Sequence, residues 1–238
     1  MKVTHNQLFP LTMSVYKPDY KITEEEIEFL KNVEVATEED MEQHVHLSKN
    51  IDILNTCPEL KNIRDVMLSV AEEYKRDVLG ISNQLAPLHN WLSKQYKGGH
   101  HHRHNHPSVL FNLVYYIHGS ENAPLRLELG NSKSRLQEGY DFSFNRAKMT
   151  PFNSQGHIHF PKDGEIVCIP GWLNHGTDIS KGFRMCIGWN FFINGIVGED
   201  KYDRVELDIG TIDMTIKHSK PGESEIQKLI ATRLDNDK

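Results

Sequence analysis

Two long apolar runs limit the folds open to this chain of 238 residues. They are VLFNLVYYI at 109–117, which is apolar on both alternating faces, and FRMCIGWNFFI at 183–193, which is apolar except at Arg184 and Asn190. An extended strand with two apolar faces has to be covered on both sides, so each run predicts a strand between a second sheet and another layer. Shorter runs of strand type lie at 125–129 and 165–169, separated by Gly, Pro, Asn and Asp. The sequence therefore predicts a β-sandwich or barrel core.

The first hundred residues read as mostly helical. Thr23 and Glu26 have the spacing of a capping box at the start of a helix. A second helix is predicted after Pro58, because apolar residues recur there at helical intervals, and Gly80 is a plausible stop. The acidic and polar stretch 34–50 between them is predicted to be a loop.

One domain covering 1–238 is expected, because no repeat, linker or second boundary divides the chain. Within it we expect a helical layer and a first strand over 1–90, the β core over 91–208, and a strand or helix over 209–238. The polar stretch 130–163 is predicted to be a long irregular excursion near the mouth of the core. Apolar residues after Gly222 predict a last amphipathic helix.

Charge and cysteine content exclude several classes of protein. The net charge is −6, from 27 basic and 33 acidic residues, and no long basic block is present, which argues against a nucleic-acid partner. No stretch approaches the ~20 apolar residues of a membrane helix, and no secretory signal is evident. The three cysteines lack CxxC spacing, which argues against a disulfide framework and fits a reducing compartment. A cytoplasmic location is therefore predicted.

The segment GGHHHRHNHPS is the most unusual part of the sequence, with five of the 14 histidines. Its alternatives are a solvated polar loop and a metal site. His104 and His106 would point the same way in an extended chain, about 6.5 Å apart, and so could hold one metal ion. His100 and His102 share that parity, but Pro107 marks where the next strand bends or begins and favours the nearer pair. Replacement of one ligand by His102 stays open.

Two further residues complete a candidate site. A metal site with three ligands on one face needs a donor from another strand, and His175 follows the predicted strand at 165–169. Arg184 lies within an apolar strand, where an unpaired charge is costly, and no acidic residue shares its face. Its partner is either a distant Asp or Glu or the carboxylate of a small molecule. Asn190 follows Arg184 by an even number of positions, so in a strand the two side chains share one face.

These residues occur among motifs that resemble the 2-oxoglutarate and Fe(II)-dependent oxygenases, above all a group found in some phages and marine bacteria. The resemblance covers most of the chain and rests on several ordered motifs: NQLFP (6–10), PEL (58–60), Trp91, KGG (97–99), HNHP (104–107), VYYI (114–117), PKDGEIVCIPGWLNH (161–175) and R-x-C-x-x-x-N (184–190).

The resemblance implies a fold, a site and an activity. The fold is mainly β with flanking helices around a double-stranded β-helix, a jelly-roll or cupin-like core. The site holds Fe(II) on His104, His106 and His175, and Arg184 binds the distal carboxylate of 2-oxoglutarate, with Asn190 as a second cofactor contact. The activity couples oxidative decarboxylation of 2-oxoglutarate to oxidation of a substrate, most often hydroxylation, with ascorbate as a stimulant. The substrate class implied is a small molecule or a protein or peptide side chain.

One departure and two alternatives accompany this interpretation. The commonest triad in the superfamily has Asp or Glu where this chain has His106, so three imidazoles leave the iron one unit more positive. A cupin-type metalloprotein that does not use 2-oxoglutarate is the first alternative, because Gly164, Pro170 and His175 match the spacing of the second cupin motif. The second alternative is a protein that binds metal through its histidines and has no catalytic activity.

Overall fold

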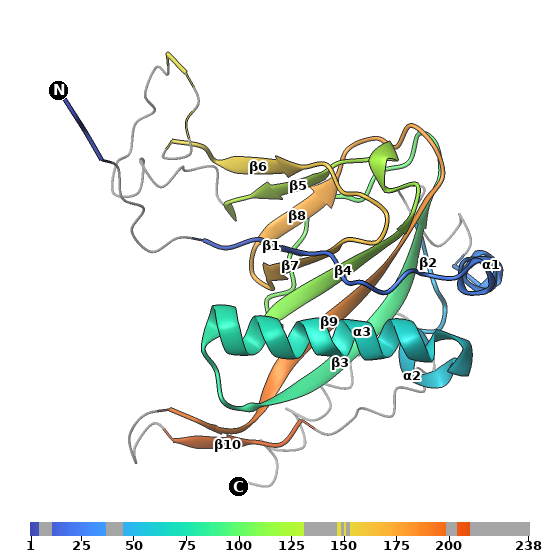
Figure 1. Ribbon diagram of the computed structural model, residues 1–238, viewed down its shortest axis with the longest axis horizontal. Coiled ribbons are helices and arrows are strands. Elements are labelled where there is room, and N and C mark those ends of the chain that lie inside the picture. The colour runs from blue at the N-terminus through green and yellow to red at the C-terminus, as the bar shows by residue number, and fades with distance from the viewer. Residues whose placement is uncertain are drawn as a thin grey trace, which may run out of the picture.

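Two antiparallel sheets form the centre of the protein. The computed structural model describes residues 1–4, 11–36, 45–130, 147–148, 150, 153–198 and 204–209. The larger sheet has seven strands in the order β1-β7-β4-β9-β3-β2, with β10 paired to β9, and the smaller has the order β6-β5-β8 (Figure 1). The strands of the larger sheet are β1 (Ser14–Tyr16), β7 (Ile166–Pro170), β4 (Phe111–His118), β9 (Arg184–Val197), β3 (Gln84–Gln95), β2 (Val45–Leu47) and β10 (Val205–Leu207). Those of the smaller are β6 (Gly156–His159), β5 (Leu125–Glu128) and β8 (Asn174–Thr177).

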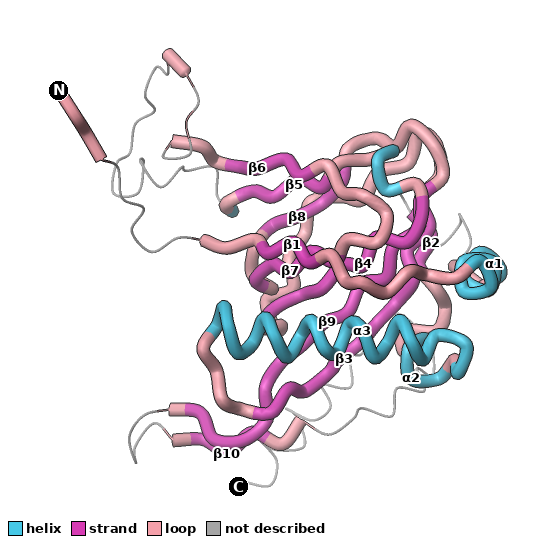
Figure 2. Tube along the Cα trace, in the orientation of Figure 1, coloured by secondary structure: helices cyan, strands magenta, loops and turns pink. Residues whose placement is uncertain are grey.

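The helices lie on one side of the larger sheet (Figures 1 and 2). They are α1 (Glu24–Asn32), α2 (Ile53–Thr56), a 3-10 turn (Pro58–Leu60) and α3 (Lys61–Glu73), which continues as a π-helical segment (Tyr74–Leu79). Gly80 ends this segment in the left-handed conformation, φ 65°, as the sequence predicts for a helix stop. A short 3-10 turn (Ser120–Asn122) connects β4 to β5. No helix among the residues described is both long and apolar enough to cross a membrane.

Two apolar layers explain why β4, β7 and β9 are buried on both faces. The first layer joins the helices to one face of the larger sheet and includes Met67, Leu113 and Trp189. The second lies between the two sheets and includes Tyr116 and Leu127. The two-faced apolar runs therefore occupy the centre of a sandwich, as predicted, and the mainly β fold with flanking helices is confirmed.

The capping box at the start of α1 is formed as the sequence predicts. The Glu26 amide donates to Thr23 Oγ1 (3.2 Å), and the Thr23 amide donates to a carboxylate oxygen of Glu26 (2.8 Å). The Tyr20 hydroxyl also donates to the Glu26 carboxylate (2.6 Å), which ties the preceding segment to the helix.

Thr23→Ala is expected to lower the free energy of unfolding by about 1 kcal/mol, because it removes the side-chain acceptor at the helix N-terminus. Urea denaturation of the purified protein measures the change. Thr23→Ser keeps the hydroxyl and is the matched control, so an alanine variant as stable as the serine variant would contradict the role given to the cap.

Two strands, β2 and β6, lie where the sequence predicted none, and β3 crosses an expected boundary. The N-terminal region read as helical contains β3, a strand of twelve residues that spans the expected boundary at residue 90, and the division into 1–90, 91–208 and 209–238 stays a prediction. The predicted loop 34–50 contains β2, which pairs with β3. The predicted irregular excursion contains β6, which pairs with β5. None of these strands shows a clear alternation of apolar and polar residues. Pairing with a neighbouring strand, rather than the sequence pattern of the strand itself, fixes the conformation. The predicted C-terminal helix lies outside the described residues.

Candidate metal centre and cofactor pocket

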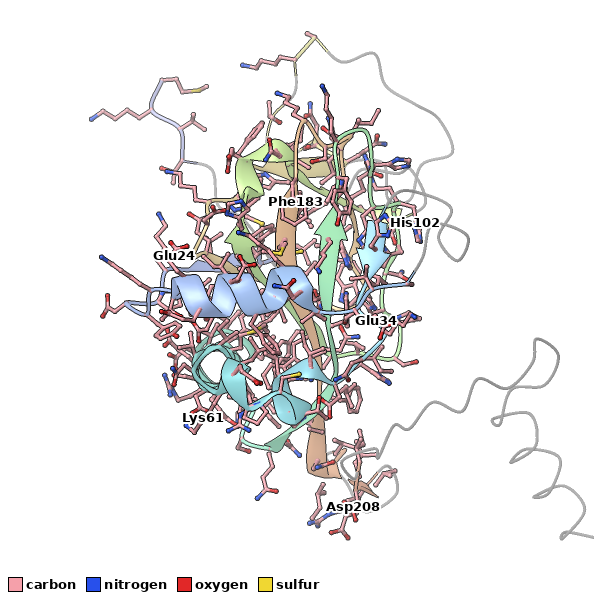
Figure 3. The ribbon with its side chains drawn as sticks, turned by 90° about the vertical axis from the view of Figure 1, so that its right-hand side faces the viewer. Glu24, Glu34, Lys61, His102, Phe183 and Asp208 are labelled. Carbon is pink, nitrogen blue, oxygen red and sulfur yellow. The ribbon has the colours of Figure 1, made fainter. Side chains whose placement is uncertain are left out.

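The histidine tract packs on the turn between β7 and β8. His104 and His175 form an isolated antiparallel bridge, in which the His104 amide donates to the His175 carbonyl (3.0 Å) and the His175 amide donates to the His104 carbonyl (2.8 Å). The His106 amide donates to the Gly171 carbonyl (2.7 Å). The tract is therefore held against the β7–β8 turn by backbone hydrogen bonds. Figure 3 shows His102, within this tract, on the side of the molecule away from Glu24 and Lys61.

Two glycines make this close approach possible. A Cβ at Gly171 would lie 2.1 Å from the Val109 carbonyl oxygen, and one at Gly176 would lie 2.7 Å from the carbonyl oxygen of His101. Any side chain at either position would push the chain around the tract away from β8, which carries His175, and from the turn before it. The sequence therefore needs glycine at both positions to bring distant histidines together.

His104, His106 and His175 are brought together as the sequence predicts. One ligand nitrogen from each lies within 4.8 Å of the others, and these three form the one such group among the residues described. The ring centroids of His104 and His175 are 4.4 Å apart. The exposed His102 is not a member of the group. One detail of the prediction is wrong: His106 precedes a turn, and the strand after Pro107 begins only at Phe111.

Hydrogen bonds orient two of the imidazoles for metal binding. Nδ1 of His104 lies 2.9 Å from the His102 carbonyl oxygen, and Nδ1 of His175 lies 2.9 Å from that of Leu173. A carbonyl oxygen can only accept, so Nδ1 carries the proton and Nε2 keeps its lone pair. The same arrangement orients histidine ligands in metal sites.

The third imidazole has a buried nitrogen without a protein partner. Nε2 of His106 is buried and makes no hydrogen bond. A buried nitrogen without a partner destabilises the folded protein, and a bound metal ion would supply the partner. The donor set of three histidines suits Fe(II), and so the residues present fit the predicted ion.

The electrostatics of the group favour neutral imidazoles. Burial, together with the neighbouring His104 and other histidines, lowers the pKa of His175 to about 3 and that of His106 to about 4. Burial also lowers the pKa of His104. All three rings therefore carry lone pairs at neutral pH, as metal ligation requires.

Arg184 lies buried at the start of β9, with 4% of its surface exposed. One Nη donates to Oε1 of Gln95 (2.9 Å), the other lies 3.6 Å from Sγ of Cys186, and Nε has no partner. The guanidinium lies 5.6 Å from the ring centre of Tyr116, a cation–π distance. Among the described residues no carboxylate forms an ion pair with it, so the alternative of an internal acidic partner has no support there.

Asn190 lies on β9 as predicted but at some distance from Arg184. Asn190 follows Arg184 by six positions, which correspond to about 20 Å of extended strand. Its side-chain oxygen accepts from the amide of Asn112 (2.7 Å), the residue opposite it on β4. The cofactor contact assigned to Asn190 stays a prediction.

Sequence reasoning missed two contacts of the candidate site residues. The Trp91 indole packs over Gly188, where a Cβ would lie 2.7 Å from it, and its ring centre is 5.8 Å from that of His106. Gln95 contacts Arg184 directly because the two are register partners on β3 and β9. Neither contact has a local signal, since each depends on the pairing of strands far apart in the chain.

Comparison with solved structures gives the fold a class. A structure of HygX from Streptomyces hygroscopicus with nickel and 2-oxoglutarate bound aligns with a TM-score of 0.51 at 15% identity, covering 76% of this chain and 82% of that one. A prolyl hydroxylase from Trichoplax adhaerens, in complex with a hypoxia inducible factor peptide fragment, aligns with a TM-score of 0.52 at 9% identity, covering 76% and 83%. These similarities show the fold of the 2OG-Fe(II) oxygenases, so the double-stranded β-helix prediction is confirmed. No curated protein matched the sequence.

A family model matches part of the sequence. Residues 89–190 match the family model described as "Putative 2OG-Fe(II) oxygenase". This segment is less than half of the chain; it contains the three histidines and Arg184, and it is similar to the 2OG-Fe(II) oxygenases. The recognition of this enzyme class from the motifs is confirmed, and with it Fe(II) and 2-oxoglutarate as the cofactor and cosubstrate of the class.

Proposed function

We propose that the protein is an Fe(II)- and 2-oxoglutarate-dependent hydroxylase in which His104, His106 and His175 bind the metal. The observation that carries this proposal is the convergence of three oriented imidazoles from two distant segments, with one ligand nitrogen of each within 4.8 Å of the others. When bound, Fe(II) and 2-oxoglutarate supply the oxidation, in which 2-oxoglutarate is converted to succinate and CO2 and one oxygen atom of O2 is transferred to the substrate.

The role proposed for the protein is to orient ligands and exclude water. The hydrogen bonds from Nδ1 of His104 and His175 keep both rings turned with Nε2 toward the group. His104, His106 and His175 would hold the ion with three protein ligands, which would leave coordination positions open to the cosubstrate. The absence of a carboxylate from the triad leaves the bound ion with an additional positive charge, which strengthens its attraction for the anionic cosubstrate.

Arg184 is proposed to bind the distal carboxylate of 2-oxoglutarate. Its burial, its unpartnered Nε and its neutral neighbours support this role. A guanidinium offers planar donors that match a carboxylate, and an anion would relieve the cost of the buried charge. A cupin that does not use 2-oxoglutarate has no comparable need for a buried arginine at this position.

The proposed substrate is a small molecule or a protein or peptide side chain. HygX has been crystallised with hygromycin B, and the Trichoplax enzyme with a peptide fragment, so both kinds of ligand occur in proteins with this fold. The net charge of −6 gives no electrostatic reason to expect nucleic acid.

The protein loaded with Fe(II) and supplied with O2 and 2-oxoglutarate is expected to produce succinate. Ascorbate is included because it is the expected stimulant. Mass spectrometry of a cell extract incubated with the protein is expected to reveal a product heavier by one oxygen atom. Iron-dependent oxidation that needs no 2-oxoglutarate would favour the cupin alternative. Tight metal binding without O2 consumption would favour the non-catalytic alternative.

A further inference from the structure

Gln95 is the direct protein partner of the buried guanidinium of Arg184. The side chain is 2% exposed, and its Oε1 accepts from Arg184 Nη1 at 2.9 Å. The two residues are opposite one another on β3 and β9. The contact is therefore built into the register of the central strands.

Neighbouring groups fix the orientation of the Gln95 amide. Its Nε2 donates to the Gly99 carbonyl oxygen (2.8 Å) and to Oγ1 of Thr177 (3.1 Å). A carbonyl oxygen only accepts, so a flipped amide would place two acceptors face to face at Gly99. The amide oxygen must then face Arg184. Oγ1 of Thr177 is itself positioned by the His101 amide, which donates to it (2.8 Å).

The choice of an amide has an electrostatic consequence. A carboxylate at this position would pair with Arg184 and neutralise it before any ligand arrived. The amide oxygen of Gln95 accepts from Arg184 (2.9 Å) and lies 3.3 Å from the Thr177 hydroxyl, and because it is neutral it leaves the guanidinium its full positive charge, while Nε of Arg184 has no hydrogen-bond partner. A charged side chain held in place by a neutral acceptor is suited to receive an anion.

We propose that Gln95 is a positioning residue that holds Arg184 in a charged and oriented state for the distal carboxylate of 2-oxoglutarate. This inference rests on the proposed function. Through Thr177, two residues after His175 on β8, and through Gly99, at the start of the histidine tract, Gln95 also joins the arginine to both segments that carry the metal ligands.

The test compares two ligands of the Ni(II)-loaded protein by titration calorimetry. Ni(II) replaces Fe(II) so that no turnover occurs. 2-Oxoglutarate is expected to reach both the metal and Arg184, whereas oxalate is expected to chelate the metal alone. Gln95→Met removes the acceptor while keeping the length of the side chain, and Gln95→Glu introduces the neutralising carboxylate. Gln84→Glu makes the same charge change at an exposed position on the same strand.

Gln95→Met is expected to weaken 2-oxoglutarate binding about tenfold and Gln95→Glu about a hundredfold, from the loss of orientation and then of charge. Oxalate binding is expected to stay within about twofold of wild type in both variants, as is 2-oxoglutarate binding in Gln84→Glu. Unchanged 2-oxoglutarate affinity in the Gln95 variants, or equal losses for both ligands, would overturn the positioning role. A wild-type protein that binds metal but not 2-oxoglutarate would instead contradict the proposed function.

Discussion

Replacing His175 by alanine is expected to abolish succinate formation and to weaken Fe(II) binding. Changes to residues around a metal ligand typically lower metal affinity by about 10–100-fold, and removal of the ligand itself is expected to lower it further. His175 is the one member of the group that comes from β8, and its 6% exposure leaves little room for a substitute ligand. The remaining pair would have to bind the ion with one protein ligand fewer. Anaerobic titration with Fe(II), followed by calorimetry, measures the affinity.

His100→Ala is the matched control, since His100 is exposed and belongs to the same tract. Its iron affinity is expected to equal that of wild type. If iron affinity instead survived His175→Ala and fell only in variants of the tract, the histidines of the tract would bind metal by themselves. The cross-strand site would then be wrong.

Arg184→Ala is expected to raise the 2-oxoglutarate concentration needed for half-maximal succinate formation by about tenfold to a hundredfold. The variant loses charge-assisted hydrogen bonds to the distal carboxylate, each worth about 1.5–3 kcal/mol. Metal affinity is expected to change little, because Arg184 is not among the three grouped ligands. Steady-state kinetics with varied 2-oxoglutarate, at saturating Fe(II), measures the 2-oxoglutarate concentration needed for half-maximal activity.

Two further variants make the result specific. Arg184→Lys keeps the charge but loses the planar donors, so an intermediate requirement is expected. Arg64→Ala removes an arginine from α3 and is expected to leave the requirement unchanged. An alanine variant with wild-type dependence on 2-oxoglutarate would remove Arg184 from the cofactor pocket.

The sequence predicted the candidate metal ligands more clearly than the strands that position them. His104, His106 and His175 were identified from spacing and from family motifs, because the chemistry restricts which residues can serve. The two-faced apolar runs predicted the buried central strands for a similar reason, since burial on both faces leaves a clear local pattern.

The rest of the site depends on contacts between distant segments. Gln95 carries no local sign that it contacts Arg184, because that contact follows from the register of β3 and β9. The role of Gly171 is equally hidden, since the group that excludes a side chain there is the carbonyl of Val109. Strands such as β2 and β6 are short and take their shape from their partners. A single sequence records none of these pairings.

The backbone bridge between His104 and His175 separates folding from metal binding, two events that are coupled in many small metalloproteins. Because amide and carbonyl groups hold these two residues together, we expect the fold to form without the ion. Chelation would then empty the centre while leaving the sandwich intact, and fresh iron could restore it without refolding. The fraction of active molecules in a cell would follow the supply of iron rather than the history of folding.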